Sequence, residues 1–291
     1  MKHFTKITLI LIFILSFNII HAQDSANRFL YELSYKPNKD SSKIIKQIVI
    51  LDITDEKSIY RDYLSVSQDS LILDAIQKSQ KAGIRLDIEK IYKIPKFTYK
   101  VIKNNSVKQV NYTDMILQDQ IGYVEPIDFK WKIENEKMNI NEWDTQKATT
   151  FYAGRKWIAW FTTKFPFQDG PYKFSGLPGL IVKIEDEFKN YSWVLSGIEK
   201  ITNYNENSLM EQGSQSKNPL IVSKDEFLKI YNDYRINPLG SVKGKITADK
   251  LSQKMPDGRT MAEILKSEEE KLKKILNENN NDIEIFNKSG K

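Results

Sequence analysis

The stretch FYAGRKWIAWFTTKFPFQDGPYKFSGLPGLIVKI, from Phe151 to Ile184, decides the fold. The chain has five tryptophans, and all of them fall between Trp131 and Trp193. Large rigid aromatic side chains bury the most apolar area per residue, whereas glycine and proline determine where a chain can turn. Because this stretch is rich in both kinds of residue, we expect it to supply the centre of the core and several of its turns.

The seven residues KWIAWFT, from 156 to 162, alternate as a strand does, with large aromatic groups on both faces. Trp157 and Phe161 share one face, and Trp160 lies on the other. A sheet with one face open to water would carry polar side chains on that face. Two interpretations remain. Either helices cover the second face, or one face forms the aromatic wall of a ligand pocket.

Glycine and proline mark two corners of the chain after this strand. The first is Gly170-Pro171, and the second is Leu177-Pro178-Gly179-Leu180. The second has the composition of a type II turn, in which proline fixes φ at the second position and glycine supplies a positive φ at the third. We predict a strand from Tyr172 to Gly176 between the corners. The turns either fix the register of the sheet or let a ligand approach the backbone closely.

Arg155 directly precedes the aromatic strand. Its planar guanidinium suits a two-point contact with a carboxylate, supplied either by this protein or by a ligand. The candidate partners within the chain are Glu142, Asp144, Asp169 and Glu185. The predicted ligand-binding residues are Arg155, Trp157, Trp160, Phe174 and Trp193.

The first residues have the composition of a secretory signal peptide. Met1 to Lys6 is basic, Ile7 to Ile20 is apolar, and Ala22 offers a small residue at the cleavage position. The apolar run is too short for a comfortable membrane span, and we find no second span. We therefore expect residues 1–22 to be removed and the mature chain to have no transmembrane segment.

Cleavage would remove both histidines, His3 and His21, and the chain has no cysteine. Without imidazole or thiol groups, a protein lacks the commonest general base, the Ser-His and Cys-His pairs, and nearly all zinc or iron sites. We therefore predict no metal, no cofactor and no catalytic residue. The enzymatic interpretation that remains is a hydrolase that uses Asp and Glu, or Ser175 with Lys173 on the same strand face.

Charge gives no indication of a nucleic-acid partner. Because Lys2 and Lys6 leave with the signal peptide, the mature chain carries 42 basic and 38 acidic residues, a net charge of +4. The basic residues are spread among acidic ones, whereas a nucleic-acid-binding protein concentrates them on one face. We expect a solvated surface of mixed charge and no nucleic-acid partner.

The other elements follow from alternation, β-branched runs and helix caps. Strands are predicted at 28–35, 44–53, 58–66, 91–102, 107–117, 129–133, 149–162, 180–185 and 191–201, with a polar link at 135–141. One helix is predicted from Asp69 to Ala82, and a second after Ser223, whose spacing to Glu226 fits a capping box. A third is predicted from Thr260 to Asn277.

These elements predict an α+β fold: a large curved antiparallel β-sheet with one early helix and C-terminal helices packed against it. We expect a single domain over residues 23–291. Within it, 203–219 is polar and aperiodic and is expected to be a flexible loop, and 223–280 forms the helical C-terminal part.

The central stretch resembles the GLPGLI family of exported proteins from Gram-negative bacteria. The motif that names the family is present as Gly176-Leu177-Pro178-Gly179-Leu180-Ile181. Its usual upstream residues are also present: Ala148, Phe151, Gly154, Arg155, Trp157, Ala159, Trp160, Phe161, Pro166, Gly170, Pro171 and Phe174. The resemblance implies export to the periplasm or beyond and a single sheet-rich domain. The family has no established biochemical activity, so the resemblance assigns no catalytic residue.

Together these observations favour an exported cell-envelope protein that binds an apolar or peptide ligand against the tryptophans near Arg155, without catalysing a reaction. Two other hypotheses stay open. One is the hydrolase described above. The other is an assembly partner of an outer-membrane complex, which would bind through the helical C-terminal part.

Overall fold

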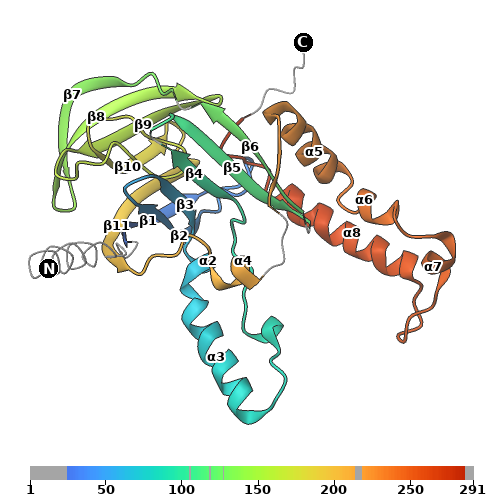
Figure 1. Cartoon of the computed structure of the whole chain (residues 1–291). Coiled ribbons are helices and arrows are strands. Elements are labelled where there is room, and N and C mark those ends of the chain that lie inside the picture. Colours follow the sequence, from blue (N-terminus) through green and yellow to red (C-terminus); the bar gives the residue numbers. More distant parts are fainter. Residues whose placement is uncertain (1–24, 105, 118, 127, 214–217, 286–291) are drawn as a thin grey trace, which may run out of the picture.

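A single twelve-stranded sheet organises the described part of the chain, as seen in a computed structural model (Figure 1). The structure describes residues 25–285, apart from 105, 118, 127 and 214–217. The strand order is β12-β6-β5-β4-β3-β2-β1-β11-β10-β9-β8-β7. Each neighbouring pair is antiparallel except β12 and β6, which run parallel. The predicted signal peptide lies outside the described residues.

The strands are β1 (Ser25–Tyr35), β2 (Ile45–Ile53), β3 (Ser58–Asp62), β4 (Lys100–Asn104), β5 (Gln109–Ile116), β6 (Asp119–Pro126), β7 (Lys132–Ile140), β8 (Trp143–Tyr152), β9 (Arg155–Thr162), β10 (Leu180–Asp186), β11 (Tyr191–Thr202) and β12 (Leu220–Val222). The helices are α2 (Leu64–Ser67), α3 (Asp69–Ala82), the 3₁₀ turn η1 (Ile88–Lys90), α4 (Leu209–Gly213), α5 (Lys224–Ile236), α6 (Gly240–Lys243), α7 (Ala248–Ser252) and α8 (Met261–Glu278).

The middle of the sheet forms as its alternation predicts. Along β1, the side chains of Phe29, Tyr31, Leu33 and Tyr35 are all buried on one face. On the neighbouring strand β11, Trp193 pairs with Leu33 and is fully buried. Aromatic and β-branched side chains that alternate in this way pack well on a pleated surface. The sheet is therefore held by its two central strands.

Residues 163–179, between β9 and β10, lie across the buried face of the sheet, and we call them the plug segment. Its Phe165 ring centroid lies 5.8 Å from that of Phe29 in β1, and its Phe174 ring centroid lies 4.8 Å from that of Trp157 in β9. The predicted strand from Tyr172 to Gly176 is therefore wrong, since Tyr172 has a positive φ of 54° and only an isolated bridge, Asp169 to Ser175, is present. The aromatic face around Trp157 is covered by this segment of chain and not by the helices.

The turn that ends the plug segment is tighter than predicted. The Gly179 N–H donates to the Leu177 carbonyl oxygen at 2.8 Å, which closes a three-residue turn and not the four-residue type II turn. A β-carbon at Gly179 would lie 2.2 Å from the carbonyl oxygen of Thr162. Only glycine lets the end of β9 pass this close to the turn, so the motif fixes how the plug segment returns to the sheet.

The three predicted helices are present. The side chain of Ser223 accepts a hydrogen bond from the Glu226 N–H at the start of α5, and Thr260 forms a complete capping box with Glu263 at the start of α8. Phe227 of α5 packs on Tyr123 of β6, whereas α3 and much of α7 and α8 extend away from the sheet (Figure 1). The fold is therefore mostly β, a large open sheet with several helices. No helix in the described ranges is long and apolar enough to cross a membrane.

Several strand predictions are wrong at their boundaries. The predicted polar link at 135–141 belongs to β7, an edge strand whose exposed side chains can be charged. The predicted strand at 91–102 forms only from Lys100 onward. The backbone N–H and carbonyl of Lys93 bond to the side chain of Gln68, so this segment is anchored by a side chain and not by a strand ladder. Strand β6 has no counterpart among the predictions.

Candidate functional site

Arg155 fixes the last described segment of the chain to the sheet. Its guanidinium donates to the carbonyl oxygens of Ile283 and Asp282 at 2.9 and 2.7 Å and to the Asn281 side chain at 2.8 Å. Its carboxylate partner is Asp186, at 3.2 Å, which is none of the four candidates predicted. Only 7% of Arg155 is exposed, so its donors serve the fold and are not presented to a ligand.

The predicted aromatic wall lies inside the core. Trp157, Trp193 and Phe174 are each 0% exposed. The two indole N–H groups are satisfied within the protein, by the Tyr152 carbonyl at 3.2 Å and the Tyr60 hydroxyl at 2.9 Å. Trp160 lies on the opposite face, 6% exposed, with the ammonium of Lys147 6.0 Å from its ring centroid. Within the described residues these side chains form packed structure, and they line neither of the two pockets described below.

Four charged side chains join the plug segment, β6, α5 and residues 279–285, which follow α8 and which we call the C-terminal segment. We call these side chains, Glu125, Lys173, Lys224 and Glu284, the charge quartet. Lys173 contacts both carboxylates, with its Nζ 2.5 Å from Glu125 Oε1. Lys224 also contacts both, at 2.6 and 3.1 Å. Burial raises the pKa of Glu284, but the two lysines outweigh burial and lower it to about 2. Because Lys173 is held by carboxylates, it is not placed as the base of a Ser175 nucleophile.

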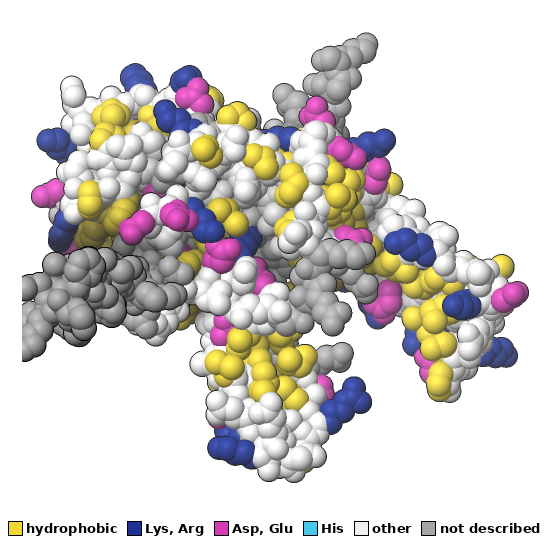
Figure 2. Space-filling view, in the orientation of Figure 1, with side chains coloured by type: hydrophobic (Ala, Val, Ile, Leu, Met, Phe, Trp, Pro, Cys, Tyr) yellow, Lys and Arg dark blue, Asp and Glu magenta, His cyan; other side chains and the backbone are white. Residues whose placement is uncertain are grey.

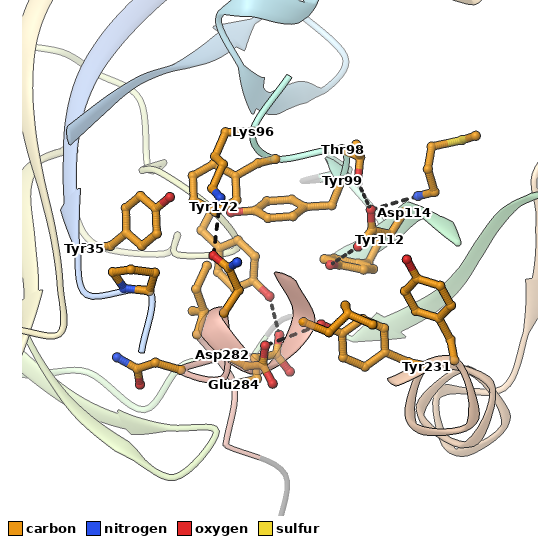
Figure 3. A pocket seen from close by; sticks show the side chains of 18 of the residues that line it. Tyr35, Lys96, Thr98, Tyr99, Tyr112, Asp114, Tyr172, Tyr231, Asp282 and Glu284 are labelled. Carbon is orange, nitrogen blue, oxygen red and sulfur yellow. Dashed lines mark hydrogen bonds between the residues drawn. The ribbon is translucent and has the colours of Figure 1, made fainter. Parts of the chain in front are cut away.

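A pocket of about 310 Å³ opens between the sheet and helices α5 and α8 (Figure 3). Its lining includes the side chains of eight tyrosines, and we call it the tyrosine pocket. These are Tyr35, Tyr99, Tyr112, Tyr123, Tyr172, Tyr191, Tyr231 and Tyr234. Neighbouring rings stack, with centroids 5.6 Å apart for Tyr99 and Tyr112 and 5.2 Å apart for Tyr112 and Tyr123. The result is an aromatic surface with polar edges, as ligand sites commonly have.

Asp114 projects from β5 at one side of the tyrosine pocket (Figure 3). It accepts hydrogen bonds from the Thr98 hydroxyl at 2.6 Å, the Met115 N–H at 2.8 Å and the Tyr112 hydroxyl at 3.3 Å. Burial raises the pKa of Asp114 to about 6, and these hydrogen bonds only partly oppose the shift. The carboxylate is therefore ionised at neutral pH at a free-energy cost.

A wider groove of about 1020 Å³ lies on the other side of the C-terminal segment. Arg155 reaches its edge, and the rings of Phe151 and Phe188 stand at its rim with 80% and 74% of their surface exposed. Most of its polar lining is paired within the protein, as the contacts of Arg155 and Asp186 illustrate. The tyrosine pocket is the more aromatic of the two sites.

Sequence reasoning missed the tyrosine pocket because its lining residues come from eight separate stretches of the chain. The available signal was local: Tyr112 and Asp114 are two residues apart on a strand, so they share one face. Tyr231 and Tyr234 likewise lie three apart on α5 and share a helix face. Neither pair shows which strand and helix face each other. That depends on how the C-terminal segment returns to the sheet.

Comparison with known protein families finds a match to the central stretch of the chain. A family model described as "Protein of unknown function (Porph_ging)" matches residues 153–183. This range contains all of β9, the plug segment and most of β10. No curated protein matches the chain.

Among solved structures, the chain is similar to PNGF-II. The structure of PNGF-II in space group C2 matches with 13% sequence identity and a TM-score of 0.50, over 73% of this chain and 33% of PNGF-II. The structure in space group P21 matches with 13% identity and a TM-score of 0.49, over 74% and 34%. The match thus spans about a third of PNGF-II. At this identity the likeness concerns the fold alone.

Proposed function

We propose that this protein is an exported member of the GLPGLI family that works in the cell envelope and binds an apolar or peptide ligand in the tyrosine pocket. Its role is recognition and not catalysis. Export is supported by the basic, apolar and small-residue regions of residues 1–22. Family membership is supported by the intact motif at 176–181, which falls within the matched range 153–183.

One observation carries the binding proposal: a pocket of about 310 Å³ that is lined by eight tyrosines yet not filled by the protein's own side chains. Tyrosine provides a large, rigid contact area at little cost in conformational entropy, together with a hydroxyl for hydrogen bonding. The plug segment fills the space that the tryptophans surround, whereas the tyrosine pocket stays open. A recognition site therefore fits here and not at Trp157 and Trp193.

Mass spectrometry of compounds released from the protein after purification from its native host tests this proposal. We expect a defined apolar compound or peptide with the wild-type protein. It should be lost from the double variant Tyr231→Ala/Tyr234→Ala, which removes one wall of the pocket. Tyr92→Ala is the matched control, because Tyr92 is also partly exposed but does not line the pocket. A wild-type protein that releases no compound, or equal recovery from both variants, would contradict the proposal.

A second candidate function, as an assembly partner of an envelope complex, is favoured by the surface of α8. Along this helix Met261, Ile264, Leu265, Leu272 and Leu276 are only partly buried, and Ile275 is 53% exposed. Figure 2 shows apolar side chains along the arm that α7 and α8 form at the right of the view. Such contiguous apolar surface is typical of a protein contact. Photo-cross-linking from position 275 in the native host should then trap an envelope protein, and cross-links confined to the chain itself would refute this candidate.

A further inference from the structure

Asp114 is the one charged side chain of the tyrosine pocket that lacks a charged or amide partner within the described residues. The pocket lining contains four charged residues, Lys96, Asp114, Asp282 and Glu284. Glu284 contacts two lysines, Asp282 lies 3.8 Å from Arg235, and Lys96 donates to the Asn279 side chain at 3.3 Å. Asp114 receives hydrogen bonds only from a threonine, a tyrosine and a backbone N–H. Among the described residues the carboxylate of Asp114 therefore has no cationic partner, and the one lysine of the lining, Lys96, is bonded to an amide and not to Asp114.

Five tyrosines lie within electrostatic reach of this charge. Burial is the main cause that raises the pKa of Tyr99, Tyr112, Tyr123, Tyr231 and Tyr234, and the charge of Asp114 raises the pKa of each of them further. An aromatic ring attracts a cation to its face, and a carboxylate beside several such rings adds a charge-assisted hydrogen bond. Both effects favour the same ligand group, a cation.

The protein itself shows that these rings accept an ammonium group. The Nζ of Lys173 lies 5.0 Å from the ring centroid of Tyr112 and 4.9 Å from that of Tyr123. That ammonium is already paired with the carboxylates of Glu125 and Glu284. Its charge is thus compensated, and it does not neutralise Asp114.

The pocket also contains a polar atom without a partner. Tyr35 is 3% exposed and lines the pocket, and its hydroxyl has no hydrogen-bond partner within the described ranges. A buried hydroxyl without a partner costs about 1–3 kcal/mol, and such groups are rare in folded proteins. A peptide ligand would offer it a backbone carbonyl or N–H.

We infer that the tyrosine pocket, in its proposed role as a binding site, receives a peptide that presents a lysine or arginine side chain. The cation lies at the carboxylate of Asp114, and the methylene stem of the same side chain packs on the tyrosine rings. This inference rests on the proposed function and adds the chemistry of the ligand. It also explains why a protein would retain an acidic group where burial disfavours its charge.

Selection from a displayed library of random peptides at pH 7.5 tests the inference with the full mature chain. We expect enriched peptides to contain lysine or arginine. Replacing that residue with norleucine, which keeps the stem and removes the charge, should weaken binding by about tenfold or more, the usual effect of losing a charge-assisted bond. The variant Asp114→Asn should weaken the basic peptide equally and leave the norleucine peptide unaffected. Asp128→Asn is the control, since Asp128 is exposed and pairs only with the exposed Lys130.

A second pair of variants tests the same inference without changing Asp114, in case Asp114→Asn fails to fold. Thr98 is exposed at the pocket rim, with its hydroxyl 2.6 Å from Asp114. Thr98→Lys supplies an internal cation at Asp114 and should abolish binding of the basic peptide, whereas Thr98→Met, without charge, should retain it. Enrichment of apolar peptides without basic residues would overturn the inference and leave the proposed function standing. Failure of the wild-type protein to select any peptide would overturn the inference and would limit the proposed function to an apolar ligand that is not a peptide.

Discussion

Two carboxylates line the tyrosine pocket, and the fold shifts their pKa values in opposite directions. Glu284 is 4% exposed and lies between two lysines, which lower its pKa to about 2. Asp114 is partly buried, receives hydrogen bonds from neutral donors alone, and has its pKa raised to about 6. Glu284 thus stabilises the folded state when ionised, whereas Asp114 destabilises it.

The difference separates a structural charge from a functional one. A buried ion pair leaves its carboxylate no free capacity for a ligand, because each oxygen already has a cationic partner. A carboxylate that keeps only neutral partners retains the capacity to bind a cation, and the protein accepts lower stability in exchange. The charge quartet therefore fixes the C-terminal segment, and Asp114 remains available at the side of the pocket.

The largest expected effect comes from removing the cation at the centre of the charge quartet. Lys173→Met leaves Glu125 and Glu284 close together in a buried site, and breaking a buried pair in this way costs about 3–5 kcal/mol. We expect the free energy of unfolding, measured by urea denaturation at pH 7, to fall by this amount. Lys130→Met, which breaks only an exposed pair with Asp128, should leave the stability unchanged. Equal stability of the two variants would show that the quartet does not hold the fold.

The next effect is the acid sensitivity caused by Glu284. Because its pKa is lower in the folded than in the unfolded state, its stabilising contribution is complete above about pH 4.5 and is lost as the pH falls towards 2. The difference in unfolding free energy between the wild type and Glu284→Gln should shrink by about 2–3 kcal/mol over this range. Urea denaturation at a series of pH values measures it. A difference that does not change with pH would mean that Glu284 is not paired as described.

Asp114 should show a smaller effect of opposite sign. Its pKa is raised by folding, so the folded state holds the proton more tightly than the unfolded state, and ionisation removes stability as the pH rises from about 4 to about 6. Relative to Asp114→Asn, the wild-type protein should therefore lose about 1–2 kcal/mol across this window. The same denaturation series provides the measurement. A wild type that gains stability relative to the variant would show that Asp114 has a cationic partner in the free protein.

The smallest expected effect comes from removing the ion pair between Asp282 and Arg235, whose charged groups lie 3.8 Å apart. Asp282 side-chain exposure is 44%, and a partly solvated pair of this length contributes about 1 kcal/mol or less. Asp282→Asn should therefore change thermal stability by only a few degrees and leave selection of basic peptides intact. Loss of peptide binding in this variant, measured by titration calorimetry, would move the cation site from Asp114 to Asp282.

Much of the sheet and the three long helices could be predicted from the sequence, because alternation and helix caps act locally. Phe29 to Tyr35 and the Ser223 and Thr260 caps illustrate this. The plug segment could not be predicted, since Tyr172 and Phe174 alternate like strand residues and nothing local shows that they lie over a sheet. The high density of aromatic residues between 151 and 184 located the core correctly. The same residues were also predicted to form the wall of a ligand pocket, because a packed core and an aromatic pocket have the same composition.

The candidate site depended on long-range contacts. Arg155 has the chemistry of a carboxylate-binding residue, and only the return of Asn281 to Ile283 along the sheet shows that its donors are used. Asp114 has no unusual neighbours in sequence. Its uncompensated charge becomes evident only when Thr98, Tyr112 and α5 are placed around it.

Site-specific titration of the Asp114 carboxyl carbon by NMR, alone and with a saturating basic peptide from the library, tests the central claim most directly. Free Asp114 should titrate at about pH 6. A bound lysine or arginine stabilises the ionised form, so the peptide should lower the pKa of Asp114 by about one unit or more, and its norleucine counterpart should not. A pKa that stays at its free value in the presence of the bound basic peptide would contradict the assignment of Asp114 as the cation site.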